Sequence, residues 1–185
     1  MKWYYEQPVK IIFGDHKIQE LSTIIQKEQY KKGILVTTTH FIKNGFAGQL
    51  LDDKKNHLAD IFAGFSPNPD VEEVNRLGEH LRKEKIDFIV ALGGGSVIDG
   101  AKAASVLIEK ETSIQKYHNT GEKVPKKHLP LIVIPTTAGT GSEVTNVSVL
   151  TNRKQGIKAP IASESFYSQY AIVDPTLTWS MPQDL

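Results

Sequence analysis

Three consecutive glycines, Gly93 to Gly95, separate an apolar run from a helical pattern of small and apolar residues. The apolar run, 87–92, has the length and composition of a strand that is buried on both faces. The order therefore predicts a strand, a tight loop and a helix. Because glycine has no side chain, a bulky ligand can approach the backbone amides of such a loop. Amides at a helix N-terminus lack partners and attract anions, so the stretch predicts a cradle for a nucleotide phosphate.

The rest of the chain repeats the order of strand and helix. Asp70, for example, has the position of an N-cap before a helix whose residues Val71, Val74 and Leu77 share one apolar face. Such repetition is typical of a doubly wound, mostly parallel α/β sheet of the Rossmann-like class. We expect strands at 9–13, 33–38, 58–62, 87–92, 131–134 and 170–175, and helices around 18–25, at 41–54, after Asp70 and at 97–110.

The pattern changes after Glu143. Residues 144–150 alternate between apolar and polar, 151–156 are polar turn material, and 157–162 alternate again. This order predicts a β-hairpin. We expect it at the edge or rim of the sheet, because Pro160 cannot donate to a hydrogen-bond ladder. The chain has no internal repeat, and we expect one domain over residues 1–185.

Composition excludes several classes of partner and of site. The chain of 185 residues has 22 basic and 21 acidic residues, so no strong field attracts nucleic acid or a membrane surface. The basic cluster 123–128 is interrupted by Pro125 and is expected to be a solvated loop. The absence of cysteine excludes disulfides and thiolate metal sites and fits a cytoplasmic protein. No apolar run approaches the roughly 18 residues that a membrane span needs.

Two known phosphate loops resemble the glycine stretch without matching it. The G-x-G-x-x-G fingerprint fits Gly93 and Gly95 but requires a third glycine where Ile98 stands. The P-loop pattern requires lysine at the position of Ala101. The loop therefore binds phosphate by a third design, or it is a glycine turn that only lets the strand and the helix pack closely.

Ser96 and Asp99 also allow two interpretations. The pattern S-x-x-D at a helix start is close to a capping box, in which both side chains bond to backbone amides and need no ligand. Alternatively, Asp99 contacts the cofactor. A carboxylate beside a pyrophosphate is unfavourable unless it accepts a hydrogen bond from a hydroxyl or amide of the ligand.

A second polar loop follows the apolar run 131–134. It combines bare backbone at Gly139 and Gly141 with four hydroxyl side chains, those of Thr136, Thr137, Thr140 and Ser142. Ligands of open α/β sheets bind at the carboxyl ends of the strands. The two loops are therefore suited to clamp a single extended ligand, although threonines of this kind also serve turns and caps.

Three motifs occur in an order that is characteristic of one known family. They are GGGSVIDGAK at 93–102, PTTAGTGSE at 135–143 and VDPTL at 173–177. Together with the loop 67–69, PNP, they resemble the iron-containing (group III) alcohol dehydrogenase family over almost the whole chain. The resemblance implies an NAD- or NADP-binding domain of an enzyme that transfers hydride between a small alcohol or aldehyde and the nicotinamide.

The resemblance also implies which residues contact the cofactor. Gly94, Gly95 and Ser96 would hold the pyrophosphate, and Asp99 would line the nicotinamide side of the cleft. The other implied contacts are Asn68 near the adenosine, Thr136, Thr137 and Thr140 on phosphate, ribose and adenine, Val149 and Leu150 beside the nicotinamide, and Lys158 on a ribose. We expect Gly95→Val to abolish binding and to leave the fold intact.

Thr38 bears on the choice of cofactor. It stands after the second expected strand, where an NAD-preferring relative has Asp. A carboxylate there accepts from the adenosine 2′-hydroxyl and repels a 2′-phosphate. Because Thr38 has no carboxylate, the sequence allows either NAD or NADP as the cofactor.

The metal of the family, Fe²⁺ or Zn²⁺, is bound in relatives by a C-terminal all-helical domain, which we expect to be absent from this chain. The histidines show no metal-ligand spacing and lie on surface-like segments, so we expect solvated or capping roles for His16, His40, His57, His80, His118 and His128. We therefore predict no catalytic residue and no metal ligand within the chain. The chain alone would bind dinucleotide weakly and would not turn over alcohol.

Two other functions remain open from the sequence. One is a domain of a dehydroquinate synthase-like or glycerol dehydrogenase-like metal enzyme, and the other is a stand-alone nucleotide-binding module. The aromatic stretch Trp3-Tyr4-Tyr5 has no evident partner within its own sheet. Since relatives often dimerise through their N-terminal strands, we expect a homodimer.

Overall fold

The sheet is parallel throughout and places both glycine-containing loops on one edge. The computed structural model describes residues 2–4, 6–109 and 112–179. Six strands pair in the order β1-β8-β5-β4-β2-β3. Ala91 pairs with Val36 on one side and with Val133 on the other. The strands are β1 (Lys10–Phe13), β2 (Gly33–Val36), β3 (Leu58–Phe62), β4 (Phe88–Gly93), β5 (Leu131–Pro135) and β8 (Tyr170–Val173).

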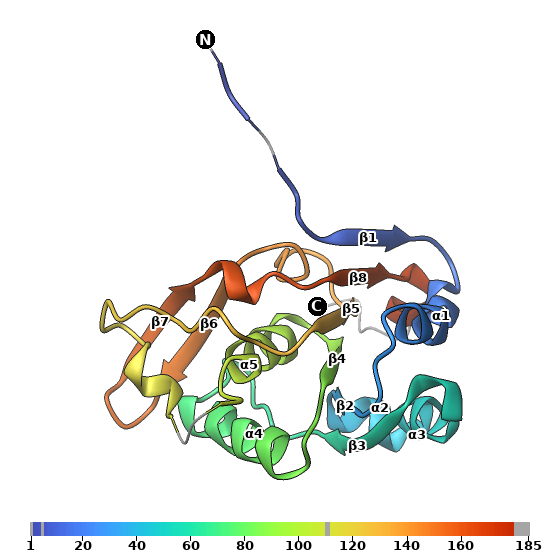
Figure 1. Ribbon diagram of the computed structural model, residues 1–185, viewed down its shortest axis with the longest axis horizontal. Helices are drawn as coiled ribbons and strands as arrows, with labels where there is room; N and C mark the ends of the chain where they lie inside the picture. The colour runs from blue at the N-terminus through green and yellow to red at the C-terminus, as the bar shows by residue number, and fades with distance from the viewer. Residues whose placement is uncertain (1, 5, 110–111, 180–185) are drawn as a thin grey trace.

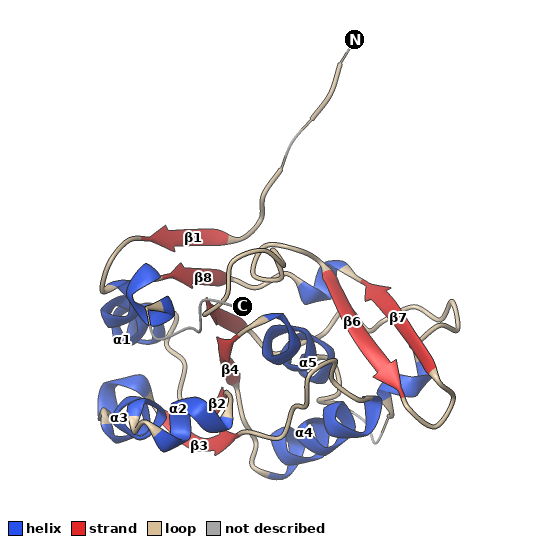
Figure 2. Cartoon of the chain, turned by 180° about the vertical axis from the view of Figure 1, so that it is seen from behind, coloured by secondary structure: helices blue, strands red, loops and turns tan. Residues whose placement is uncertain are grey.

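Helices cover both faces of the sheet (Figures 1 and 2). One face carries α1 (Glu20–Lys27), α2 (Thr39–Lys43) and α3 (Phe46–Asp52), and the other carries α4 (Val71–Lys83) and α5 (Gly95–Ser105). Successive strand residues point to opposite faces, so Leu35 and Val90 pack with α1, whereas Ile34 and Ile89 pack with α4 and α5. The expected doubly wound α/β fold is confirmed. Short 3₁₀ helices occur at η1 (Lys17–Gln19), η2 (Lys54–Asn56), η3 (Ile114–Lys116), η4 (Glu164–Phe166) and η5 (Pro175–Thr178).

The strand order identifies where a ligand is expected. Counted from β2, the order is 2-1-3-4-5, with β1 added at the far edge. The chain reverses its direction of winding between β2 and β4. Ligands of doubly wound sheets bind at such a reversal, outside the carboxyl ends of the strands. The strands β2 and β4 flank this reversal. Thr38 follows β2, and the glycine stretch lies at the end of β4.

The hairpin is present but does not lie at the edge of the main sheet, contrary to our expectation. β6 (Val147–Asn152) and β7 (Ile157–Ala162) form a separate antiparallel sheet of two strands, seen beside α4 and α5 in Figure 1. Pro160 pairs with Val149 within it. The reason for the different position is that β6 bonds to polar side chains of α5, described below, instead of to a strand edge.

Two helices differ from the expected ranges. The helix expected at 41–54 is interrupted at Gly45, which has φ of 83° and so adopts a left-handed conformation that ends one helix before the next begins. The helix expected at 97–110 begins two residues earlier and ends at Ser105. The carbonyl of Ser105, its last residue, accepts from the amide of Leu129 at 3.0 Å. Ile108 therefore lies beyond the helix.

The segment before β1 extends away from the body of the protein (Figure 1). Trp3 and Tyr4 are about four-fifths exposed, and Ile11 and Phe13 of β1 are also exposed. Tyr5 lies outside the described residues. A search of the described residues found no helix long and apolar enough to cross a membrane.

Candidate functional site

The two polar loops contact each other at the carboxyl ends of β4 and β5. A Cβ atom at Gly94 would lie 3.1 Å from Thr137 Oγ1, and one at Gly95 would lie 3.0 Å from Thr140 Cγ2. A side chain at either position would require the facing threonine to shift by a few tenths of an ångström. Gly95→Val would therefore crowd the second loop, and its effect on binding and on the fold stays a prediction.

Gly93 has a packing role. A Cβ atom there would come within 2.8 Å of Val97 Cγ2, so only glycine lets the end of β4 approach the first turn of α5 this closely. The packing interpretation of the glycine stretch is thus correct for this residue. It does not exclude a ligand, because Gly94 and Gly95 lie at the surface side of the loop and remain partly exposed.

The N-terminus of α5 has no cap from a side chain. Gly94 is the N-cap residue, and its carbonyl accepts from the amides of Val97 and Ile98 at 3.0 and 3.2 Å. The first turn contains no acidic residue. The amides of Gly95 and Ser96 precede any possible intrahelical acceptor. Among the described residues, this end of α5 therefore presents N–H groups without an intrahelical acceptor, together with the positive end of the helix dipole.

The capping-box interpretation of Ser96 and Asp99 is wrong. The helix begins at Gly95 and not at Val97, so Ser96 is the second helical residue and cannot cap. Its Oγ instead accepts from the amide of Asn68 at 3.2 Å. Because that bond uses an oxygen lone pair, the hydroxyl proton of Ser96 remains available to a further acceptor.

Asp99 joins α5 to the hairpin. Its Oδ2 accepts from the amide of Val149 at 2.9 Å, and its carbonyl accepts from Ser148 Oγ at 2.8 Å. The Oδ1 atom is buried and makes no hydrogen bond among the described residues. Burial raises the pKa of Asp99, while the Val149 amide and the charge of Lys102 oppose that rise. In this structure the carboxylate holds β6 on the helix.

Lys102 continues this attachment one turn later. Its Nζ donates to the carbonyls of Thr145 and Val147 at 2.8 and 3.0 Å and to Thr145 Oγ1 at 3.2 Å. The side chain is fully buried, and burial lowers its pKa to about 8. Sequence reasoning missed this residue. The available signal was a single lysine within the small and apolar run of α5, where a buried charge requires several partners.

Asn68 connects three segments of the site. Its side chain Oδ1 accepts from Lys158 Nζ of β7 at 2.6 Å, and its amide donates to Ser96 of α5. Its φ of 57° lies in the left-handed region, which asparagine tolerates better than most residues. Asn68, Ser96 and Lys158, which are far apart in the sequence, are thus brought together.

Other predicted residues lie near this group without joining it. Thr38 follows β2 two residues after Val36, at the same edge of the sheet, where it is the N-cap of α2. Thr136 lies at the end of β5, and its amide donates to the carbonyl of Gly93 at 3.1 Å. Val149 is beside Asp99, whereas the side chain of Leu150 is fully buried in the core.

The histidines are not all at the surface, which corrects our expectation. His118 is buried, and its Nε2 lies 3.1 Å from the carbonyl of Leu150, because the segment after η3 packs beneath β6. The described residues contain no group of three or more His, Cys, Asp or Glu side chains that could hold a metal ion.

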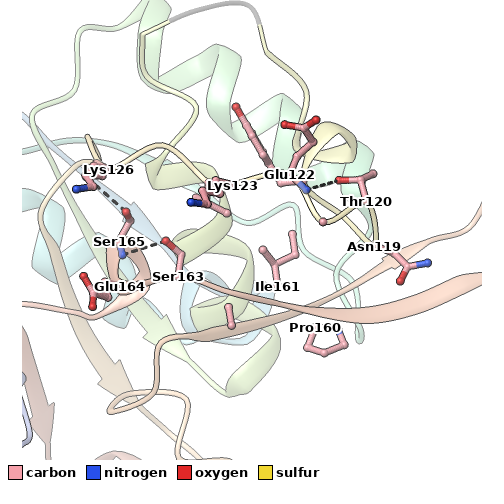
Figure 3. A pocket seen from close by; sticks show the side chains of 14 residues that line it. Asn119, Thr120, Glu122, Lys123, Lys126, Pro160, Ile161, Ser163, Glu164 and Ser165 are labelled. Atoms are coloured by element: carbon pink, nitrogen blue, oxygen red, sulfur yellow. Dashed lines mark hydrogen bonds between the residues drawn. The ribbon is translucent and has the colours of Figure 1, made fainter.

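A pocket of about 440 Å³ lies elsewhere, between the segment 117–126 and the end of β7 (Figure 3). Ile161 and Pro160 line it from β7, and Lys123 and Lys126 line it from the opposite segment. None of the predicted cofactor residues lines this pocket. The candidate site is therefore the open edge formed by the two loops, Asn68 and the hairpin.

Comparison with known proteins identifies the family of the chain. The model of a family described as iron-containing alcohol dehydrogenase matches residues 8–175. A sulfoacetaldehyde reductase of Bilophila wadsworthia is 34% identical over 175 residues, which are 94% of this chain and 45% of that protein.

Two solved structures are similar as well. The crystal structure of sulfoacetaldehyde reductase from Bifidobacterium kashiwanohense in complex with NAD⁺ is 50% identical with a TM-score of 0.95, covering 98% of this chain and 48% of that one. NADH-dependent butanol dehydrogenase A from Thermotoga maritima is 28% identical with a TM-score of 0.90, covering 99% and 46%. The chain thus spans about half the length of these relatives.

Proposed function

The chain belongs to the iron-containing alcohol dehydrogenase family, and on that premise we propose that it forms the domain that binds the nicotinamide dinucleotide of an alcohol or aldehyde oxidoreductase. The observation that carries the proposal is the uncapped N-terminus of α5, which lies at the reversal of strand order beside the loop after β5. An anion is the ligand that such a helix end favours. The pyrophosphate of a dinucleotide supplies one.

The residues at the edge suit the parts of a dinucleotide. The amides of Gly95 and Ser96 would bind pyrophosphate oxygens, and the free hydroxyl proton of Ser96 would donate to one of them. Thr137 and Thr140 of the second loop lie against these glycines and would contact phosphate or ribose hydroxyls. Lys158 would donate to a ribose. When bound, the dinucleotide supplies or accepts hydride at its nicotinamide ring.

We propose a small aldehyde or alcohol as the substrate, with sulfoacetaldehyde as the first to test. Two similar proteins carry that substrate in their names, one of them at 50% identity. The family is named for iron, but the described residues contain no group of side chains that could bind a metal ion. In the proposed reaction the residues at the edge hold and orient the cofactor. No observation favours a dehydroquinate synthase-like or glycerol dehydrogenase-like function, or a stand-alone nucleotide-binding module.

We propose NAD as the preferred cofactor, since a 50% identical relative binds it in its crystal structure. Thr38 carries no charge that would repel the 2′-phosphate of NADP. Thr38→Asp should therefore weaken NADPH binding more than NADH binding. Titration of both cofactors against both proteins measures this ratio. An unchanged ratio would show that Thr38 does not face the adenosine ribose.

The same proposal includes a cytoplasmic homodimer. A cysteine-free chain suits a reducing compartment. The exposed Trp3 and Tyr4 and the exposed apolar residues Ile11 and Phe13 of the edge strand β1 support association through this side. Deletion of residues 1–6 should lower the mass measured by light scattering after gel filtration, and an unchanged mass would contradict the dimer.

The experiment that tests the function is a fluorescence titration of this chain with NADH. We expect saturable binding by the wild-type protein and weaker binding by Lys158→Ala. Lys154→Ala is the matched control, because it removes the same charge from the hairpin turn without touching Asn68. A wild-type chain that does not saturate with NADH would refute the proposed function.

A further inference from the structure

The turn of the hairpin is fastened to the loop that carries Asn68. Arg153 lies in this turn between β6 and β7, and Ser66 and Asp70 lie on either side of Asn68 in the sequence. The Arg153 Nη2 donates to Ser66 Oγ at 2.6 Å, and its Nε lies 3.5 Å from Asp70 Oδ2. Its backbone amide donates to the same Asp70 oxygen at 3.1 Å. We call these three residues the Arg153 clasp.

Both acceptors of the clasp are themselves fixed. Asp70 is 7% exposed, and its Oδ1 accepts from the amide of Glu72 as the cap of α4. Ser66 donates to Glu73 Oε2 at 3.1 Å from both its amide and its hydroxyl. The clasp therefore ties the hairpin turn to the rigid N-terminus of α4.

The chain between the two acceptors is short and stiff. Only Pro67, Asn68 and Pro69 separate Ser66 from Asp70, and each proline restricts its own φ and the residue before it. The positions of the two ends therefore determine where Asn68 stands. A further bond from the amide of Thr151 to the carbonyl of Pro69, at 2.9 Å, keeps the hairpin beside the loop.

We propose that Arg153 is a positioning residue for the dinucleotide, which holds Asn68 and Lys158 at the separation that the cofactor requires. This inference rests on the proposed function. The fold does not depend on the side chain of Arg153, because Asp99 and Lys102 already hold β6 on α5. The Arg153 side chain is 59% exposed, and exposed ion pairs contribute little to stability. Its loss should affect binding without unfolding the protein.

The test compares variants of the hairpin turn and of the loop in NADH titrations. Arg153→Ala should weaken binding by about threefold to tenfold, as expected for one hydrogen-bonded contact. Lys154→Ala, at the adjacent charge in the turn, should bind like wild type, since Lys154 donates to Glu72 and not to the loop that carries Asn68. Asp70→Asn should also weaken binding, because asparagine caps a helix as well as aspartate does but presents no negative oxygen to Arg153.

A double-mutant cycle with Asn68→Gly shows whether Arg153 acts through Asn68. Glycine accepts the left-handed φ of this position and removes only the side chain. We expect Arg153→Ala to cause no further loss of affinity in the Asn68→Gly protein, with all midpoints of thermal unfolding within about 2 °C. Equal affinity of wild type and Arg153→Ala, or losses that multiply, would overturn the inference. Absence of binding by wild type would instead refute the proposed function, and this inference with it.

Discussion

The helices α4 and α5 begin at the same edge of the sheet with opposite chemistry. At α4, Asp70 caps the amide of Glu72 at 2.9 Å, and Glu73 accepts from the amide of Asp70 at 2.9 Å. Its first turn contains two acidic residues. At α5, the N-cap is glycine and makes no side-chain cap, and the first turn contains no acidic residue.

The difference supports our proposal that the N-terminus of α5 is the helix end that binds the ligand. A capping box satisfies the amides of a helix internally and so contributes to stability without any partner. A glycine cap leaves the amides of Gly95 and Ser96 to be satisfied from outside. Instead of a cap, α5 has stabilising hydrogen bonds in its middle, where Asp99 and Lys102 bond to β6 and to the segment just before it.

Giving α5 a cap like that of α4 should have the largest effect. Gly94→Asp would place a carboxylate on the free amides and opposite the pyrophosphate, so we expect NADH binding to weaken by about a hundredfold or more. Gly94→Ala is the control, since it adds the same Cβ against Thr137 without the charge. Fluorescence titration measures both. Equal losses in the two variants would show that crowding, and not the cap, decides binding.

The attachment of α5 to the hairpin through Lys102 should make the free energy of unfolding depend on pH. Burial lowers the pKa of Lys102 to about 8, whereas the unfolded chain keeps a value near 10.5. Between these values the unfolded state binds more protons than the folded state, so stability rises with pH. The free energy of unfolding of wild type relative to Lys102→Met should increase by about 3 kcal/mol across this window. Urea titrations at several pH values test it, and a flat difference would show that Lys102 keeps its usual pKa.

Removing the cap of α4 should lower stability by less. Asp70→Ala loses the cap and leaves the amide of Arg153 without its acceptor, so we expect the free energy of unfolding to fall by about 1 to 2 kcal/mol. Asp70→Asn keeps the cap but also loses the oxygen that accepts from Arg153, so its loss should be smaller, about 0.5 to 1 kcal/mol. Equal destabilisation of the two variants in urea would show that the contact with Arg153, and not the cap, stabilises this end.

The smallest effect is expected at the exposed ion pair between the hairpin turn and α4. Lys154 is mostly exposed, and its ion pair with Glu72 at 2.9 Å is open to solvent. Lys154→Ala should leave the midpoint of thermal unfolding unchanged within the error of the measurement. A clear drop would mean that the hairpin turn depends on this pair as well as on Arg153.

Much of the fold could be predicted because buried parallel strands produce unmistakable apolar runs. Residues 88–92 and 131–134 are examples, and both lie in the centre of the sheet. The hairpin was expected at the wrong place because alternation predicts strand pairing and does not say which surface the pair covers. The partners that place it are Asp99 and Lys102, and their interaction with β6 spans more than forty residues of sequence.

The candidate site was predicted in part. The two loops and Lys158 come to one edge, because the carboxyl ends of parallel strands share it. The roles of Ser96 and Asp99 as caps were wrong because the helix begins at Gly95, and a shift of two residues moves a side chain off the capping position. The Arg153 clasp could not be predicted from the sequence, because the polar residues of a hairpin turn are normally expected to face solvent.

The most direct measurement is of the amide resonances at the two helix ends during titration with NADH. The proposal predicts that the ¹⁵N–¹H resonances of Gly95 and Ser96 shift progressively and saturate, because their amides acquire phosphate acceptors. The amides of Glu72 and Glu73 in α4, which already have acceptors, should barely move. Shifts that leave Gly95 and Ser96 unchanged while NADH binds elsewhere, or no shifts at all, would contradict the claim that the uncapped end of α5 holds the dinucleotide.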